Sequence, residues 1–417
     1  MKTILFDDGR WHDLLPLTAT RPVSYLRCGI LTIHEKWELA LNTQIGHLTQ
    51  GYLSQKFPTP PSSIYKAING GIFPNVELCA AINALQDPGQ CLMHGDTIIA
   101  AVITESELHH TWELKEKINF QGPLLEIKNL WNIFKLNAVA IQADFEAITH
   151  GRESAPLSPT NGKIGSQPIF LEEGAKVEYC NFNTTQGPIY IGKDAEIMEG
   201  GNFRGPIAFC EHSITKLATK IYGATTIGPG CRAGGELNNA VMMANSNKGH
   251  DGFLGNSVIG EWCNIGADTN NSNLKNNYDM VKLWNYPSQK FVNTGEQFCG
   301  LFMADHSKCA INTMFNTGTV VGVSCNIFGD GFPRNYIPHF SWGGAGGFND
   351  YKLDKALESM DRVLERRGQK LSEVDKSIFE KIYAELIARF WCQPSIRYDD
   401  IIKNRPCILI GKGTDSI

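Results

Sequence analysis

Hydrophobic residues return at every sixth position through the middle of the chain. The series comprises Ile191, Ile197, Phe203, Phe209, Ile221, Ile227 and Ala233, with polar Thr215 at the remaining position. A helix repeats at 3.6 residues and a half-buried strand at 2, so a sustained period of six predicts short parallel strands stacked as a β-helix. The spacing returns at Ile259 and Ile265, and again between Met303 and Ile327. A large part of the chain is therefore expected to be a solenoid.

The first 150 residues have a different pattern. Strand-like apolar runs at 3–6, 91–94 and 97–102 alternate with helical stretches, of which 76–85 is the clearest. This alternation predicts an α/β domain over residues 1–150.

Prolines and glycines mark the expected boundaries in the rest of the chain. A polar segment at 151–165 is typical of a linker, and the solenoid is expected over 166–342. The six-residue period is lost at 275–300, which predicts an insertion projecting from the coils.

The chain after the solenoid is expected to be helical, over residues 343–417. Four glycines between 343 and 347 suggest a hinge. Apolar residues then fall on one face of each of two helices, the first from Leu353 to Leu364 and the second from Ile378 to Phe390. Such helices would cap the solenoid or dock on a neighbouring surface.

Composition excludes several classes of protein. A length of 417 residues exceeds what one core supports, so two or more domains are expected. With 42% hydrophobic residues and a net charge of −5, we expect neither disorder, nor a membrane span, nor a nucleic-acid surface. The twelve cysteines include no Cys-x-x-Cys pair, so we expect reduced, buried thiols. The apolar run at 1–6 is too short for a signal peptide, which predicts a cytoplasmic location.

Candidate chemistry is densest between Arg232 and Lys275. The segment contains Arg-Ala-Gly-Gly-Glu-Leu at 232–237, Ser-Asn-Lys-Gly-His at 246–250, Gly-Ala-Asp-Thr at 266–269 and Asn-Leu-Lys at 273–275. It resembles the acyltransferase half of the bifunctional glucosamine-1-phosphate N-acetyltransferase/N-acetylglucosamine-1-phosphate uridylyltransferase family. It is also similar to the archaeal sugar-1-phosphate relatives of that family. The resemblance implies that the solenoid is a left-handed β-helix built of hexapeptide repeats.

The resemblance aligns His250 with the catalytic base of the family. That base takes a proton from the amine of an amino sugar 1-phosphate as the amine attacks the thioester of acetyl-CoA. Imidazole suits this task because its unperturbed pKa lies closest to neutral pH. The alternative is a loop histidine hydrogen-bonded to a carbonyl.

Other residues of the same segment are implied to bind substrates. Arg232 and Lys248 would bind the sugar phosphate, although either could be an ordinary solvated charge. Asn273 would contact the sugar or the acetyl group, although asparagine is also common at coil corners.

The acetyl-CoA contacts and three departures complete the comparison with the family. Ala267 and Thr269 would contact acetyl-CoA. Phe253 replaces a tyrosine, so one hydroxyl contact to the substrate is absent, and Lys275 replaces an arginine at the substrate. Asp268 replaces a glycine. Acyl transfer is therefore predicted, while the acceptor stays open.

The first domain resembles a divergent sugar-1-phosphate nucleotidyltransferase. Gly9 and Arg10 match part of the family's phosphate loop, and Arg21 could add charge for a nucleotide. Asp96, in a His-Gly-Asp sequence, resembles an aspartate that helps hold Mg²⁺, but a Gly-Asp pair is also an ordinary turn. Val23 stands where the family has a lysine.

Three hypotheses follow. The first is a β-helix acetyltransferase using acetyl-CoA and an amino sugar 1-phosphate. The second adds or substitutes Mg²⁺-dependent nucleotidyl transfer from UTP or dTTP in residues 1–150. The third is a scaffold that only binds nucleotide sugars. By analogy with related β-helix acyltransferases, a homotrimer is expected, in which the site lies between chains.

Overall fold

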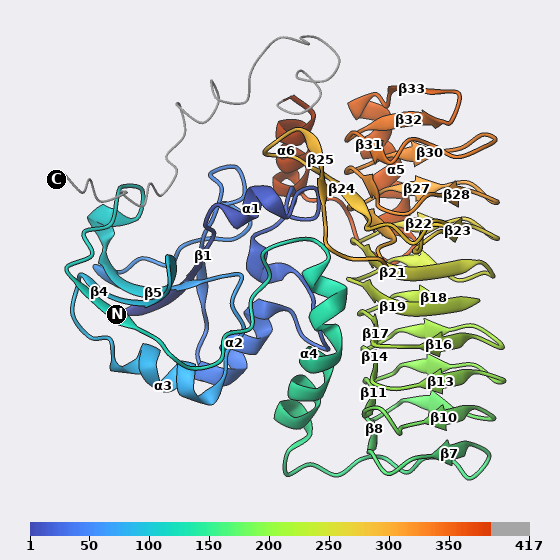
Figure 1. The fold of residues 1–417 in the computed structure, drawn as a ribbon, viewed down its shortest axis with the longest axis horizontal. Helices are drawn as coiled ribbons and strands as arrows, with labels where there is room; N and C mark the ends of the chain where they lie inside the picture. Colours follow the sequence, from blue (N-terminus) through green and yellow to red (C-terminus); the bar gives the residue numbers. More distant parts are fainter. Residues whose placement is uncertain (385–417) are drawn as a thin grey trace.

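The computed structural model describes residues 1–384, which form an α/β domain, a parallel β-solenoid and two further helices (Figure 1). The solenoid stands as a column, and the first domain lies along one side of it. The predicted fold class is therefore confirmed, while the left hand of the coil stays a prediction. The second predicted helix extends to Phe390, and its end lies outside the described residues.

A six-stranded mixed sheet forms the first domain. Its strand order is β2-β1-β3-β5-β4-β6, with β5 antiparallel to both neighbours and the other pairs parallel. The strands are β1 (Lys2–Phe6), β2 (Gly46–Leu48), β3 (Ile64–Asn69), β4 (Gln90–His94), β5 (Thr97–Thr104) and β6 (Glu116–Asn119). The helices are α1 (Arg10–Asp13), η1 (Val23–Tyr25), α2 (Ile33–Leu41), α3 (Val76–Ala84), η2 (Glu105–Glu107) and α4 (Asn132–Thr149). The helix expected at 76–85 is α3, which begins where the Asn75 side chain accepts a hydrogen bond from the backbone of Leu78.

Each regular coil of the solenoid contributes one strand to each of three faces. The first face contains β7 (Gly162–Ile164), β10 (Asn181–Asn183), β13 (Asn202–Arg204), β16 (Lys220–Tyr222) and the first halves of β19 (Glu236–Met242) and β21 (Phe253–Ile259). A short pair, β23 (Asn270–Asn271) and β28 (Met314–Phe315), follows it.

The second face lies towards the first domain. It contains β8 (Ile169–Leu171), β11 (Ile189–Ile191), β14 (Ile207–Phe209), β17 (Thr225–Ile227), the second halves of β19 and β21, β26 (Leu301–Met303), β29 (Thr319–Val321) and β31 (Tyr336–Ile337). The third face contains β9 (Lys176–Val177), β12 (Glu196–Ile197), β15 (Ile214–Thr215), β18 (Arg232–Ala233), β20 (Asn247–Lys248), β22 (Asn264–Ile265), β27 (Lys308–Cys309), β30 (Asn326–Ile327) and β32 (Ser341–Gly344).

The six-residue repeat marks the inward columns of these faces. On the second face Ile191, Phe209 and Ile227 lie above one another and are fully buried. Thr215 keeps the inward register although it is polar, and it is 1% exposed. The ten cysteines among the described residues are all free, and nine of them are buried, as the sequence predicts.

Helix α4 joins the first domain to the second face. The Asn137 amide donates to the carbonyl of Ala224 (3.1 Å) and accepts from the Thr226 hydroxyl (3.1 Å). Its oxygen also accepts from the backbone N–H of Gly29 (2.7 Å), so one side chain ties a loop of the first domain to the coil. In Figure 1 α4 runs beside the column, between the sheet and the coils.

The insertion and the last helices also contact the first domain. The insertion forms an antiparallel hairpin, β24 (Lys282–Asn285) and β25 (Lys290–Asn293). Helices α5 (Leu353–Glu365) and α6 (Glu373–Ile382) fold back along the side of the solenoid. The hinge expected at 343–347 is wrong, because these glycines belong to an antiparallel hairpin of β32 with β33 (Gly347–Asp350). No helix among residues 1–384 has both the length and the apolar character that crossing a bilayer requires.

Candidate functional site

A pocket of about 410 Å³ opens at the carboxyl end of β1 in the first domain. It brings together Gly9, Arg10 and Asp96, three residues that the sequence predicts to bind nucleotide or metal. Its full lining is Phe6, Asp8, Gly9, Arg10, Asp13, Asn69, Asp96, Thr97, Ile98, Lys128 and Asn129. The residues of this pocket therefore come mainly from the end of β1 and the loop after it, the end of β3, the β4–β5 turn and the segment before α4.

Arg10 is fixed in this pocket by carboxylates. Its Nε lies 3.2 Å from Oδ2 of Asp8 and its Nη2 lies 2.8 Å from Oε2 of Glu126. The third nitrogen, Nη1, is buried without a hydrogen-bond partner among residues 1–384. A buried guanidinium N–H without an acceptor costs free energy.

Two adjacent aspartates that the sequence prediction overlooked shape the loop after β1. Asp7 accepts a hydrogen bond from the backbone of Val23 (2.9 Å), and burial raises its pKa to about 7. Asp8 accepts from the Asn69 amide (2.8 Å) and from the backbone of Arg10 (2.9 Å). The signal was present, since two aspartates and a glycine directly follow an apolar strand.

Asp96 occupies the turn between β4 and β5, next to Gly95, whose φ is +56°. Asp96 therefore belongs to an ordinary turn, which was one of the two alternatives from the sequence. Its exposed carboxylate also lines the pocket. Within residues 1–384 no group of three or more His, Cys, Asp or Glu side chains forms a cage for a metal ion. Mg²⁺ needs no such cage, since it is usually bound by one or two carboxylates together with substrate phosphates.

The structure places Arg21 away from this pocket. Its side chain is buried against the solenoid, where it pairs with Glu261 (2.5 Å) and with Asp305. Burial alone would lower the pKa of Arg21, but the negative charges of Asp305 and Glu261 raise it further, so Arg21 stays charged. This residue is an interdomain contact, and it is not part of the nucleotide site that the sequence suggested.

His250 lies at the corner between the third and first faces, between β20 and β21. Its imidazole is exposed and makes no hydrogen bond within residues 1–384. Three residues on, Phe253 points outward from the first face. A Cβ on Gly255 would lie 2.4 Å from Cζ of Phe253 and 2.7 Å from Nδ2 of Asn273, so both side chains cover this glycine.

Asn273 lies at the opposite edge of the first face. Its amide donates to Oδ1 of Asn256 (2.8 Å), the residue where β21 bends from the first face to the second. Six residues separate His250 from Asn256, which at strand rise is about 20 Å at most. His250 therefore precedes the first-face part of β21, and the Asn256–Asn273 pair lies where that part ends.

Lys248 points into the solenoid. It lies in the inward column of the third face, beside Ala233, and is 2% exposed. Its Nζ donates to the carbonyls of His250 (2.6 Å), Gly234 (3.0 Å) and Asp251 (3.3 Å). Burial lowers its pKa to about 8. The ammonium group therefore holds the corner that carries His250, and in this position it does not reach the surface where a sugar phosphate would bind.

The remaining residues of the segment lie in different places. Arg232 is on the third face near Arg367, whose pKa is lowered by burial and by the positive charge of Arg232. Lys275 begins the insertion and donates to the carbonyl of Met280 (3.1 Å). Ala267 is partly exposed, whereas Thr269 is buried and its hydroxyl is 3.3 Å from the carbonyl of Ala310.

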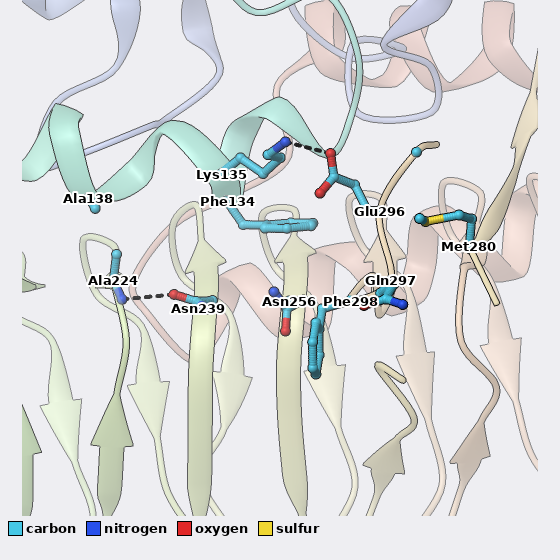
Figure 2. Close-up of a pocket in the computed structure, with 11 residues that line it drawn as sticks. Phe134, Lys135, Ala138, Ala224, Asn239, Asn256, Met280, Glu296, Gln297 and Phe298 are labelled. Atoms are coloured by element: carbon cyan, nitrogen blue, oxygen red, sulfur yellow. Dashed lines mark hydrogen bonds and ion pairs between the residues drawn. The ribbon is translucent and has the colours of Figure 1, made fainter. Parts of the chain in front are cut away.

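A second pocket, of about 420 Å³, lies between α4, the solenoid and the insertion. Figure 2 shows Phe134 above Asn256 and Phe298, with the Lys135–Glu296 ion pair at the upper edge. Asn256 bonds Asn273 and also lines this pocket. One edge of the first face is therefore continuous with the junction between the domains.

Comparison with known proteins gives the family of the first domain. Residues 3–153 match the model of a family described as sugar nucleotidyl transferase. The first domain is nucleotidyltransferase-like. The pocket containing Arg10 is thus the pocket of a nucleotidyltransferase-like domain, which confirms the resemblance seen in its sequence.

Two curated relatives are similar to parts of the chain, one part longer than the other. A bifunctional sugar-1-phosphate nucleotidylyltransferase/acetyltransferase of Sulfurisphaera tokodaii is 26% identical over 285 residues, which cover 66% of this chain and 60% of the relative. The bifunctional protein GlmU of Methanocaldococcus jannaschii is 33% identical over 92 residues, or 22% of each chain. The chain therefore spans less than two thirds of either relative.

Solved acetyltransferases show only a distant likeness. The polysialic-acid-specific acetyltransferase NeuO is 12% identical, covering 50% of this chain and 94% of its own, with a TM-score of 0.24. The Arabidopsis UDP-N-acetylglucosamine acyltransferase is 13% identical, covering 60% and 88%, with a TM-score of 0.21. At these scores the likeness carries no argument about fold or function.

Proposed function

We propose that this chain is a sugar-phosphate transferase with two reaction sites, one for nucleotidyl transfer in the nucleotidyltransferase-like domain and one for acetyl transfer on the solenoid. The observation that carries the proposal is the convergence of Gly9, Arg10 and Asp96 in one pocket of that domain. The Sulfurisphaera relative, which is named for both reactions, supports the pairing of the two sites.

In the first site, an oxygen of a sugar 1-phosphate attacks the α-phosphorus of UTP or dTTP. A new P–O bond forms, the bond to the β-phosphate breaks and pyrophosphate leaves. The unpaired Nη1 of Arg10 donates to a phosphate oxygen, and Lys128, whose ammonium pairs with Glu126 (2.5 Å), lies beside it in the pocket. Asp8, Asp13 and Asp96 offer the oxygen ligands that Mg²⁺ prefers, and the bound ion would neutralise phosphate charge.

Pyrophosphate release from UTP or dTTP in the presence of a sugar 1-phosphate tests this site. Arg10→Gln keeps a planar polar side chain but removes the charge, so we expect release to fall by about 10²-fold or more. The control is Arg334→Gln, an exposed arginine of the solenoid, which should release pyrophosphate like wild type. Unchanged release by Arg10→Gln would contradict the assignment.

In the second site, the amine of an amino sugar 1-phosphate attacks the carbonyl carbon of acetyl-CoA. A C–N bond forms, His250 takes the amine proton, and the C–S bond breaks to release CoA thiol. The exposed imidazole of His250 supports this role, and Phe253 and Asn273 lie on the face beside it. Ala267 is retained as an acetyl-CoA contact. Lys248 and the buried Thr269 are assigned to the interior of the coil.

We further propose that this second site forms between chains of a homotrimer. His250 and Asn273 flank one exposed face of the solenoid from opposite edges, so the His250 edge of one chain can meet the Asn273 edge of a neighbour. The free state of the ten cysteines within residues 1–384 supports a cytoplasmic location for both reactions.

Thiol release from acetyl-CoA with glucosamine 1-phosphate as acceptor tests acetyl transfer. We expect His250→Ala to lower release by about 10²-fold to 10⁴-fold, because the amine then loses its base. His212→Ala, at an exposed corner of an earlier coil, serves as the control. Acceptor-dependent release that survives in His250→Ala would remove this residue from the mechanism.

A further inference from the structure

A third pocket, of about 300 Å³, lies where the first domain, the solenoid and the C-terminal helices meet. Neither reaction site includes it. Its lining is Thr20, Arg21, Tyr25, Lys56, Phe57, Glu261, Trp262, Asp305, His306, Gln369, Leu371, Asp375, Ile378 and Phe379. All three parts of the described chain thus contribute side chains to one small cavity.

Two aromatic residues at successive coil corners form one wall. Trp262 and His306 occupy the same corner of neighbouring coils, each with φ +59°, and their rings are stacked at 6.3 Å and 13°. The same corner of other coils holds Asp194, His212, Gly230, Asn245, Ser324 and Phe340. The left-handed corner therefore repeats along the solenoid, and what distinguishes these two coils is the stacked pair of aromatic rings.

Two polar groups that line this cavity lack partners. Arg21 and His306 are each 5% exposed, yet Arg21 Nε and His306 Nδ1 are buried and have no hydrogen-bond partner among residues 1–384. Burial lowers the pKa of His306 to about 3, so its ring is neutral at neutral pH. A ligand acceptor at the unpaired donor of Arg21 would be favourable, because a buried donor without a hydrogen bond costs free energy.

The charges of the cavity do not favour an anion. Arg21 is already paired with Glu261 and Asp305, and Lys56 is paired with Asp375 (2.7 Å). Two cations therefore face three carboxylates. A ligand that is flat, uncharged and rich in both donors and acceptors matches this combination of aromatic wall, unpaired groups and carboxylates.

We propose that this junction pocket binds a nucleobase-type ring, as a free nucleoside without phosphates. The ring would lie on the Trp262–His306 wall, accept a hydrogen bond from Arg21 Nε and donate to the partly exposed carboxylate of Glu261. Because these contacts come from both the first domain and the solenoid, binding stabilises the arrangement of the two. This inference is independent of the proposed reactions.

Calorimetric titration of the full chain with adenosine, guanosine, cytidine, uridine and thymidine tests the pocket. We expect at least one nucleoside to bind at millimolar concentration or below, and His306→Asn to weaken that binding by about tenfold or more. Asparagine tolerates the left-handed backbone, so the variant keeps the corner. His212→Asn makes the same change at an exposed equivalent corner and should bind like wild type.

A second variant keeps the test decisive if His306→Asn does not fold. Glu261→Gln preserves the shape of a partly exposed side chain and leaves Asp305 on Arg21, and we expect it to weaken the same nucleoside by severalfold. The proposal is overturned if none of the five nucleosides binds at about 10 mM, or if binding is unchanged in the folded variants. Tighter binding of the matching nucleoside triphosphate to Arg10→Gln protein would also overturn it, since this pocket should reject phosphates.

Discussion

The pocket at Arg10 and the coil corner at His250 are built in opposite ways. Arg10 and Asp96 are far apart in sequence, but the loop after β1 and the β4–β5 turn lie on one sheet, separated by β3, and both line one pocket. His250 and Asn273 are close in sequence but lie at opposite edges of a flat, repeating face. A sheet with loops at one end concentrates side chains, whereas a solenoid spreads them along lines. In the proposed function, the first site is formed by one chain and the second is shared between two chains.

The largest expected effect is on pyrophosphate release at the Arg10 pocket, which we propose that a single chain forms. Arg10→Ala and Asp96→Ala should each lower pyrophosphate release by about 10²-fold or more, since each removes a contact to the phosphates or their ion. Coexpressing the two variants should restore nothing, because no chain then has both residues. Recovery of release in the mixture would show that the first site also spans chains.

The same experiment on the solenoid should give the opposite result. If each acetyl-transfer site takes His250 from one chain and Asn273 from a neighbour, random assembly of His250→Ala and Asn273→Ala chains leaves about a quarter of the sites intact. Thiol release by the coexpressed pair should therefore return to about a quarter of wild type. A mixture as inactive as either variant alone, or a monomer by light scattering, would count against a shared site.

A third prediction concerns Lys248, whose side chain is buried beneath the corner that exposes His250. Its folded pKa is about 8, below its ordinary value near 10.5, so between these pH values the unfolded chain binds more protons and stability rises with pH. Lys248→Met lacks this dependence. The unfolding free energy of wild type minus that of the variant should therefore increase by about 2 kcal/mol from pH 8 to pH 10.

Urea denaturation of both proteins at pH 7, 8, 9 and 10 measures that difference. A constant gap would mean that Lys248 keeps its charge on the solvent side, as the sequence resemblance implied. Lys216→Met, at a partly exposed lysine directly after β15, provides the baseline.

The smallest expected effect is at the insertion. Asn285 of β24 donates to Oδ1 of Asp13 (3.2 Å), and Asp13 lines the Arg10 pocket. Burial raises the pKa of Asp13, while the Asn285 contact opposes that shift. Asn285→Ala should therefore raise the KM for nucleotide by a few-fold and leave thiol release unchanged, with Asn293→Ala on β25 as the control. Equal changes in both reactions would indicate a general loss of stability.

The sequence predicted the solenoid because the inward residues repeat every six positions. The six-residue period did not predict the inward positions of coils that have a different length. Tyr190 and its partner Ala208 are 18 residues apart, whereas Thr226 and its partner Val241 are only 15 apart. Counting in sixes therefore loses the register in the shorter coils. Lys248 entered the inward column there, and its charge made it look like a surface residue.

Other features depended on contacts that a sequence does not display. Arg21 looked like a phosphate ligand, but its partners Glu261 and Asp305 lie more than 200 residues away. In contrast, α4 was detectable, since its buried residues Ile133, Asn137, Ile141 and Asp144 recur at helical spacing. The prediction overlooked it because two of these four residues are polar.

Helix α4 also limits how this protein can change in length during evolution. Its 18 residues extend about 27 Å, which is the height of five or six coils at about 4.8 Å each. Duplicating or deleting a coil beneath it would displace the Ala224 and Thr226 contacts of Asn137 by one full coil step. Whole coils can therefore be gained or lost only beyond the two ends of this helix, and the helix acts as a ruler for the part of the solenoid that it covers.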